Sequence, residues 1–133
     1  MHDHIARTRP DALLVFDEGG ITGHPDHCHA TRAALIAARQ HDLPVLAWTI
    51  PDQVAAILNA EFGTTFTGRP ARQIHLAVTV DRTAQLKAIT CHASQSAANP
   101  VLWRRLDLLA STEHLRYLRD GVIMTAHPAP GQQ

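Results

Sequence analysis

The 133-residue chain lacks the features that mark several classes of protein. Its two cysteines, Cys28 and Cys91, are too few for a disulfide framework. Twelve basic residues balance twelve acidic ones, which argues against a nucleic-acid binder that works through bulk positive charge. No apolar run approaches the roughly 20 residues of a membrane-spanning helix. The polar start, MHDH, shows no signal peptide, so we expect a cytoplasmic protein.

What the chain has in excess is histidine, with ten residues of this type. Clustered histidines suggest a metal site, because neutral imidazole is a common zinc ligand. An apolar share of 45% is typical of a folded globular protein, and the length suits one domain. We therefore expect a single domain over residues 1–133, with residues 128–133 as a frayed tail.

Buried strands and amphipathic helices alternate along the sequence. Residues 12–16 (ALLVF) predict a strand buried on both faces, residues 28–40 a helix, and residues 44–50 a second strand. This order predicts a parallel βαβ unit. Further helices are predicted at 51–62, 82–97 (capped by Asp81) and 100–109, and strands at 73–80 and 122–124, while residues 113–119 are ambiguous. The expected fold is a Rossmann-like α/β fold with a mostly parallel sheet flanked by helices.

The candidate chemistry concentrates in residues 23–29 (GHPDHCH), just after the first predicted strand. Ligands bind at the carboxyl ends of strands in parallel sheets. His24 and His27 are three residues apart, so at the start of a helix both imidazoles can turn toward one point. Asp26 is close enough in sequence to hydrogen-bond one ring, which would fix its tautomer and favour its charged form. From the residues alone, a metal site and a polar helix-capping loop both remain open.

A catalytic zinc normally takes three protein ligands and leaves one place for water. His27 could supply one ligand, or His24 and His27 together two, so the chain offers part of a site. Asp17 and Glu18 border the same loop and could reach the site, although we expect them to be solvated turn residues. Trp48 and Trp103 are interpreted as core or groove aromatics, and Arg104, Arg105, Arg116 and Arg119 as solvated residues on helix faces.

Residues 9–17 (RPDALLVFD) and 20–27 (GITGHPDH) resemble the "rPDvvvtfD…tGHPDH" block of the PIG-L/LmbE family. These proteins are zinc-dependent deacetylases of N-acetylglucosamine conjugates. Residues 87–95 (KAITCHASQ) resemble the family's "K-x-A-(x)3-H-x-(S/T)-Q" helix, and residues 112–116 (TEHLR) are similar to the Glu-containing segment that follows it. The resemblance covers nearly the whole chain in the family's order.

The resemblance implies roles for three residues of the loop. His27 matches the family's third zinc ligand. His24 matches a catalytic histidine that acts as imidazolium, stabilising the oxyanion or protonating the leaving amine, and Asp26 would raise its pKa. His92 and Gln95 match a recurrent helix, in which packing is the expected role.

The resemblance also implies that the chain is incomplete. The family opens with a strand ending in "AHPDDE", which supplies two zinc ligands and the general base, and no such motif precedes Ala12. Residues 1–9 look like the end of the helix before the first strand seen here. We expect the carboxyl-terminal portion of a zinc-dependent deacetylase, inactive alone, whose substrate is an N-acetylated amino-sugar conjugate. Its expected partner is a complementing amino-terminal chain or a second copy.

Two other functions stay open. The chain could be a non-catalytic remnant or binding module that keeps the fold. It could also be a weak histidine-based metal-binding protein, although the histidines outside residues 23–29 are scattered.

Overall fold

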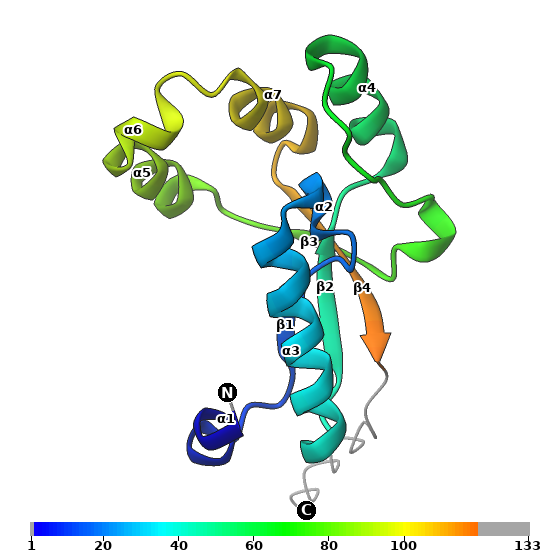
Figure 1. The fold of residues 1–133 in the computed structure, drawn as a ribbon. Coiled ribbons are helices and arrows are strands. Elements are labelled where there is room, and N and C mark those ends of the chain that lie inside the picture. The colour runs from blue at the N-terminus through cyan, green and yellow to red at the C-terminus, as the bar shows by residue number, and fades with distance from the viewer. Residues whose placement is uncertain (1, 120–133) are drawn as a thin grey trace, which may run out of the picture.

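A computed structural model describes residues 2–119 of the chain (Figure 1). Its centre is a four-stranded sheet with the strand order β1-β2-β4-β3. The strands are β1 (Leu13–Phe16), β2 (Val45–Thr49), β3 (Leu76–Thr79) and β4 (Thr112–Arg119). The helices are α1 (His2–Thr8), α2 (Gly20–Gly23), α3 (Pro25–His41), α4 (Asp52–Phe62), η1 (Ala71–Gln73), α5 (Thr83–Cys91), α6 (Ala93–Ser96) and α7 (Pro100–Leu109).

The predicted βαβ unit is confirmed. The two apolar strands β1 and β2 pair in parallel, from Leu13 opposite Val45 to Phe16 opposite Trp48. Helix α3 makes the crossover between them and packs against β1. The expected helix before the first strand is also present, as α1.

The α/β class is confirmed, but the sheet is mixed where a mostly parallel one was expected. Strand β4 runs antiparallel to both of its neighbours, β2 and β3. The chain leaves β3, forms α5, α6 and α7, and returns at the same end, where Thr79 lies opposite Thr112. The ambiguous residues 113–119 therefore form β4, which begins at the end of the sheet where β1, β2 and β3 finish.

The helix expected over residues 82–97 is divided in two. The backbone of His92 (φ −107°, ψ 54°) is not helical and separates α5 from α6. The hydroxyl of Ser96 lies within hydrogen-bond distance of both the Ile89 and the His92 carbonyl oxygens and shares its proton between them. The N-cap residue of α5 is Arg82, one position after the predicted Asp81, but the Asp81 carboxylate does accept from the backbone N–H of Thr83 in the first turn at 2.9 Å. In Figure 1, α5 and α6 extend sideways from the body, and we refer to these two helices as the helical arm. The predicted strand at 122–124 and the tail at 128–133 lie outside the described residues.

The core lies at the carboxyl end of the parallel strands. Buried Ile21, Ile50, Ala55 and Leu109 form its centre, with Phe16, Trp48, Val54 and Phe66 packed around them. The four central residues come from α2, the residue after β2, α4 and α7. The turn that carries the candidate site is therefore packed on this core through Ile21.

Candidate active site

The segment after β1 that carries the clustered histidines, residues 17–29, is called the histidine loop, and it follows the carboxyl end of β1, as predicted. It folds through a single helical turn, α2, in which Gly20, Ile21 and Gly23 have positive φ values of 65°, 62° and 73°. Ile21 is almost fully buried in the core and anchors this turn. The chain then enters α3 at Pro25, so that His24 and His27 are presented at the start of this helix.

His27 is held by two contacts. Its ring stacks on Phe16, with 3.9 Å between ring centroids and an angle of 11° between the planes. Its Nδ1 lies 3.2 Å from the carbonyl oxygen of Gly20. A carbonyl oxygen can only accept, so Nδ1 carries the proton and Nε2 keeps a lone pair. This is the tautomer of a histidine that ligates a metal through Nε2.

His24 has the opposite arrangement. It is the N-cap of α3, and its Nδ1 accepts a hydrogen bond from the backbone N–H of Asp26 at 3.2 Å. In the neutral ring Nε2 therefore carries the proton and is a donor. The two imidazoles lie together as their spacing predicts, with 5.0 Å between centroids. One ring thus offers an acceptor nitrogen and its neighbour a donor.

Asp26 contacts His24 differently from the expectation. Its carboxylate oxygen is 4.0 Å from His24 Nδ1, an ion-pair distance beyond hydrogen-bond range, and the side chain is 85% exposed. The hydrogen bond to this ring comes from the backbone N–H of Asp26 instead. The cause is geometric, since the first free N–H groups of a helix point at the capping side chain.

The described residues do not bring a complete set of metal ligands together. Within residues 2–119, no three His, Cys, Asp or Glu side chains lie close enough to hold a metal ion. The tautomer of His27 fits a ligand, but a catalytic zinc needs three protein ligands. These residues alone therefore do not complete a zinc site.

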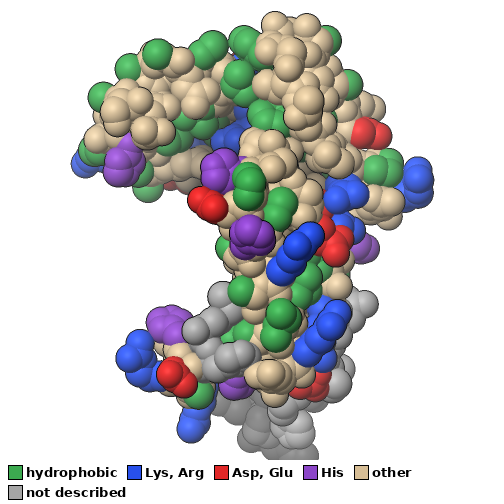
Figure 2. Space-filling view, viewed as in Figure 1, with side chains coloured by type: hydrophobic (Ala, Val, Ile, Leu, Met, Phe, Trp, Pro, Cys, Tyr) green, Lys and Arg blue, Asp and Glu red, His purple; other side chains and the backbone are tan. Residues whose placement is uncertain are grey.

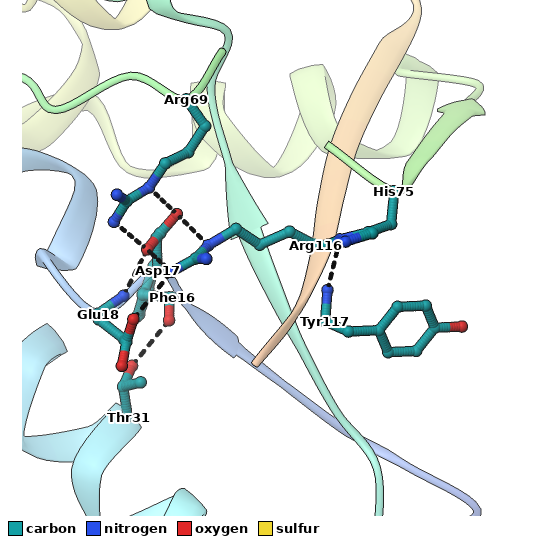
Figure 3. A network of polar contacts seen from close by, with 8 residues as sticks. All are labelled: Phe16, Asp17, Glu18, Thr31, Arg69, His75, Arg116 and Tyr117. Carbon is teal, nitrogen blue, oxygen red and sulfur yellow. Dashed lines mark hydrogen bonds and ion pairs between the residues drawn. The ribbon is translucent and has the colours of Figure 1, made fainter. Parts of the chain in front are cut away.

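Asp17, interpreted as a solvated turn residue, is instead the centre of a buried ionic cluster (Figure 3). It is 1% exposed. Arg69 donates to its two carboxylate oxygens at 2.9 and 2.7 Å, and Arg116 does so at 3.0 and 3.1 Å. Burial alone would raise the pKa of Asp17, but the hydrogen bonds from Arg69 and Arg116 outweigh it and lower this pKa to about 2.

The ionic cluster positions the start of the histidine loop. The backbone N–H of Asp17 donates to the Trp48 carbonyl at 3.0 Å, and that of Gly20 donates to the Asp17 carbonyl at 2.6 Å. Arg116 also reaches Glu18 at 2.8 Å, so two positive and two negative charges meet. Because the partners of Asp17 lie 52 and 99 residues away, no local sequence pattern signals the cluster.

A second group of side chains continues from Phe16 across the carboxyl edge of the sheet. Phe16 meets the edge of Trp48 at 6.3 Å, and the guanidinium of Arg105 lies 5.0 Å from the centre of the Trp48 ring. The indole Nε1 donates to Glu113 at 2.5 Å, and Arg82 pairs with the same carboxylate at 2.6 Å.

The interpretation of four arginines as solvated helix residues fits only Arg104, whose side chain is 37% exposed and pairs with Glu61 and Asp107. Arg105 is partly buried beside Trp48. Arg116 and Arg119 lie on β4 and pair with Asp17 and Asp42. The sequence did not reveal this, because the strand itself was ambiguous.

We compared the sequence and the fold of the chain with those of known proteins. No family model matches the chain. Three curated proteins, each named 1D-myo-inositol 2-acetamido-2-deoxy-alpha-D-glucopyranoside deacetylase, match part of it. The protein of Nakamurella multipartita is 43% identical over 53 residues, which is 40% of this chain and 16% of that protein. Those of Mycolicibacterium vanbaalenii and Kribbella flavida are 40% and 39% identical over 53 and 64 residues, covering 38% of this chain and 19% and 21% of theirs.

A crystal structure described as a deacetylase in the biosynthesis pathway of teicoplanin has a similar fold, with a TM-score of 0.60 and 24% identity. The similarity covers 87% of this chain and 48% of that one, so the described fold corresponds to about half of that protein. The sequence matches confirm the resemblance to deacetylases, and the structural match confirms the α/β fold. None of the helices within residues 2–119 is long and apolar enough to cross a membrane.

Proposed function

We propose that this chain is the carboxyl-terminal portion of a zinc-dependent deacetylase that hydrolyses the acetamide of an N-acetylglucosamine-type conjugate. The observation that carries the proposal is the pair of complementary tautomers at the end of β1, with His27 Nε2 free to ligate and His24 Nε2 protonated. The names of the matched relatives support the substrate class. The cytoplasm is the proposed compartment, since Cys28 and Cys91 are not joined in a disulfide.

Each residue of the loop has a distinct task in this proposal. Zinc, when bound, polarises the amide carbonyl and lowers the pKa of a bound water. His27 would contribute one ligand through Nε2, held in orientation by Phe16 and Gly20. His24 would donate from Nε2 to the oxygen that gains negative charge. In its protonated form, in which Nδ1 no longer accepts from the Asp26 N–H, it would supply a proton to the leaving amine. The ionic cluster around Asp17 would fix the position of the loop, and therefore of both histidine rings, relative to the sheet.

Two zinc ligands and the general base must come from outside residues 2–119. We propose that the polypeptide supplying them pairs with the outer edge of β1, which is a terminal strand of the described sheet. An unpaired strand edge presents free backbone N–H and C=O groups to an incoming strand. Leu14 on this strand is 68% exposed, and an apolar groove of about 420 Å³ runs beside it between α1, β1 and α3.

Acetate release from N-acetylglucosamine conjugates tests the proposal. The full chain is assayed with zinc, alone and with the amino-terminal segment of the Nakamurella multipartita relative. We expect negligible turnover by the chain alone, because it lacks the general base and two zinc ligands, and these groups act together as one catalytic unit. We expect turnover when the amino-terminal segment is added. His27→Ala should abolish the activity of the mixture. The matched control is His29→Ala, which removes an exposed histidine from the same helix.

The alternatives are separated in the same experiment. Turnover by the chain alone that is lost in His27→Ala would contradict the proposed incompleteness. A non-catalytic binding module, favoured by the lack of a third ligand within residues 2–119, predicts a complex that releases no acetate. Leu14→Lys should prevent complex formation if β1 is the docking edge, and sedimentation of the mixture measures this. Self-association of the chain alone through the same edge would appear as a dimer.

A further inference from the structure

Arg105 on α7 is a partly buried charge that makes no hydrogen bond to any residue within 2–119. Its Nε is fully covered and has no partner. The guanidinium is held by its contact with the Trp48 ring, 5.0 Å from its centre, and this contact uses none of its N–H groups. Burial lowers the pKa of Arg105, yet an arginine remains charged in a protein. Nearly all buried polar groups in folded proteins are paired, yet the buried Nε of Arg105 has no acceptor among residues 2–119.

The carboxylate that acts electrostatically on Arg105 is Glu113, and both of its oxygens already accept hydrogen bonds from other residues. Glu113 accepts from Arg82 with one oxygen and from the indole of Trp48 with the other. The group formed by Arg82, Arg105 and Glu113 therefore keeps one positive charge in excess. The neighbouring Arg104 gives the contrast, since it is paired with two carboxylates, those of Glu61 and Asp107.

Arg105 lies in line with the candidate active site. A continuous series of ring contacts leads from His24 to His27, Phe16 and Trp48, and ends at the guanidinium. The space-filling view is hollowed between the helical arm and the body formed by α2 and α3 (Figure 2). Histidine side chains lie on the body beside this hollow and on the underside of the arm, and Lys or Arg atoms are visible between the arm and the body. Two rings, Phe16 and Trp48, thus separate His27 from the guanidinium of Arg105.

We propose that Arg105 binds an anionic oxygen group, a phosphate or a carboxylate, on the same ligand whose acetamide lies at His24 and His27. The planar guanidinium suits such groups, because two of its N–H donors match two oxygens. That the ligand is an N-acetylated amino sugar rests on the proposed function. The proposed ligand is therefore a negatively charged sugar. No residue of the histidine loop by itself requires this charge.

Isothermal titration calorimetry of the full chain tests this without any turnover. The probes are N-acetylglucosamine 1-phosphate, N-acetylglucosaminuronic acid, uncharged N-acetylglucosamine and inorganic phosphate. We expect one of the two anionic sugars to bind about tenfold or more tightly than the uncharged sugar, and the comparison of the two identifies phosphate or carboxylate as the partner. Arg105→Gln should remove that advantage, whereas Arg104→Gln on the same helix should change it less than about twofold.

Arg105→Lys keeps the charge and loses the planar fork, so it should retain only part of the advantage and guards against a folding defect in Arg105→Gln. Anionic sugars that bind no more tightly than the uncharged one would overturn the proposal, as would equal losses in the Arg104 and Arg105 variants. Inorganic phosphate that binds as tightly as the phosphorylated sugar would overturn the assignment to a sugar. Failure of acetate release with intact, Arg105-dependent binding would instead count against the deacetylase proposal alone.

Discussion

Two carboxylates on either side of one short turn differ in almost every physical respect. Asp17 follows β1 directly, is 1% exposed and receives four hydrogen bonds from two arginines. Asp26, nine residues later, has a side chain that is 85% exposed and lies at ion-pair distance from one histidine. The first belongs to the framework and the second to an open surface. The comparison teaches that the loop is fixed from its buried beginning, which leaves the histidine rings at its other end accessible for chemistry.

The largest expected effect comes from removing the buried carboxylate. Asp17→Asn leaves Arg69 and Arg116 partly buried with the exposed Glu18 as the nearest remaining carboxylate of the cluster, which should lower the free energy of unfolding by about 3–5 kcal/mol. Asp26→Asn, the matched change on the exposed side, should stay within about 0.5 kcal/mol. Urea unfolding of the two variants measures both. Similar losses in the two would contradict the division into framework and open surface.

The free energy of unfolding should also depend on pH through the buried carboxylate of Asp17. The pKa of Asp17 falls from an ordinary 3.8 to about 2 in the folded chain. A lowered folded pKa gives stability that is present above the unfolded value and is lost as the pH falls from about 4 to about 2. The loss assigned to Asp17 is about 2 kcal/mol. Unfolding followed across this window should show it in the unaltered chain, and an equally steep fall in Asp17→Asn would exclude this assignment.

Two glycines of the turn allow a finer test, because both have positive φ but different surroundings. A Cβ on Gly20 would meet the sulfur of Cys28 at 3.0 Å and the Cβ of His27 at 3.3 Å, whereas one on Gly23 would meet nothing within 4 Å. Alanine at either position should incur the strain of positive φ. Gly20→Ala should lose about 1 kcal/mol more than Gly23→Ala, because α3 must also shift. Thermal unfolding measures the difference, and equal losses would show that His27 is not held against the turn.

Local patterns predicted much of this molecule, and long-range pairing was beyond them. The apolar run before Asp17, the helix after Pro25 and the strand at Trp48 follow from hydrophobic period and flanking turn residues. The direction of β4 does not, because residues 113–119 gain their strand partners only when β2 and β3 lie on either side. The proximity of His24 and His27 follows from their spacing along the chain. The burial of Asp17 and Arg105 depends instead on contacts between distant segments, which a single sequence leaves unmarked.

The central claim is that the two histidines are set in opposite tautomers before any ligand binds. Nitrogen NMR of the full chain, at a pH where both rings are neutral, tests this most directly by locating the proton on each ring. The account predicts a protonated Nδ1 in His27, bonded to the Gly20 carbonyl, and a protonated Nε2 in His24, whose Nδ1 accepts from the Asp26 N–H. Both rings in the same tautomer, or both averaging between tautomers as free imidazole does, would contradict it.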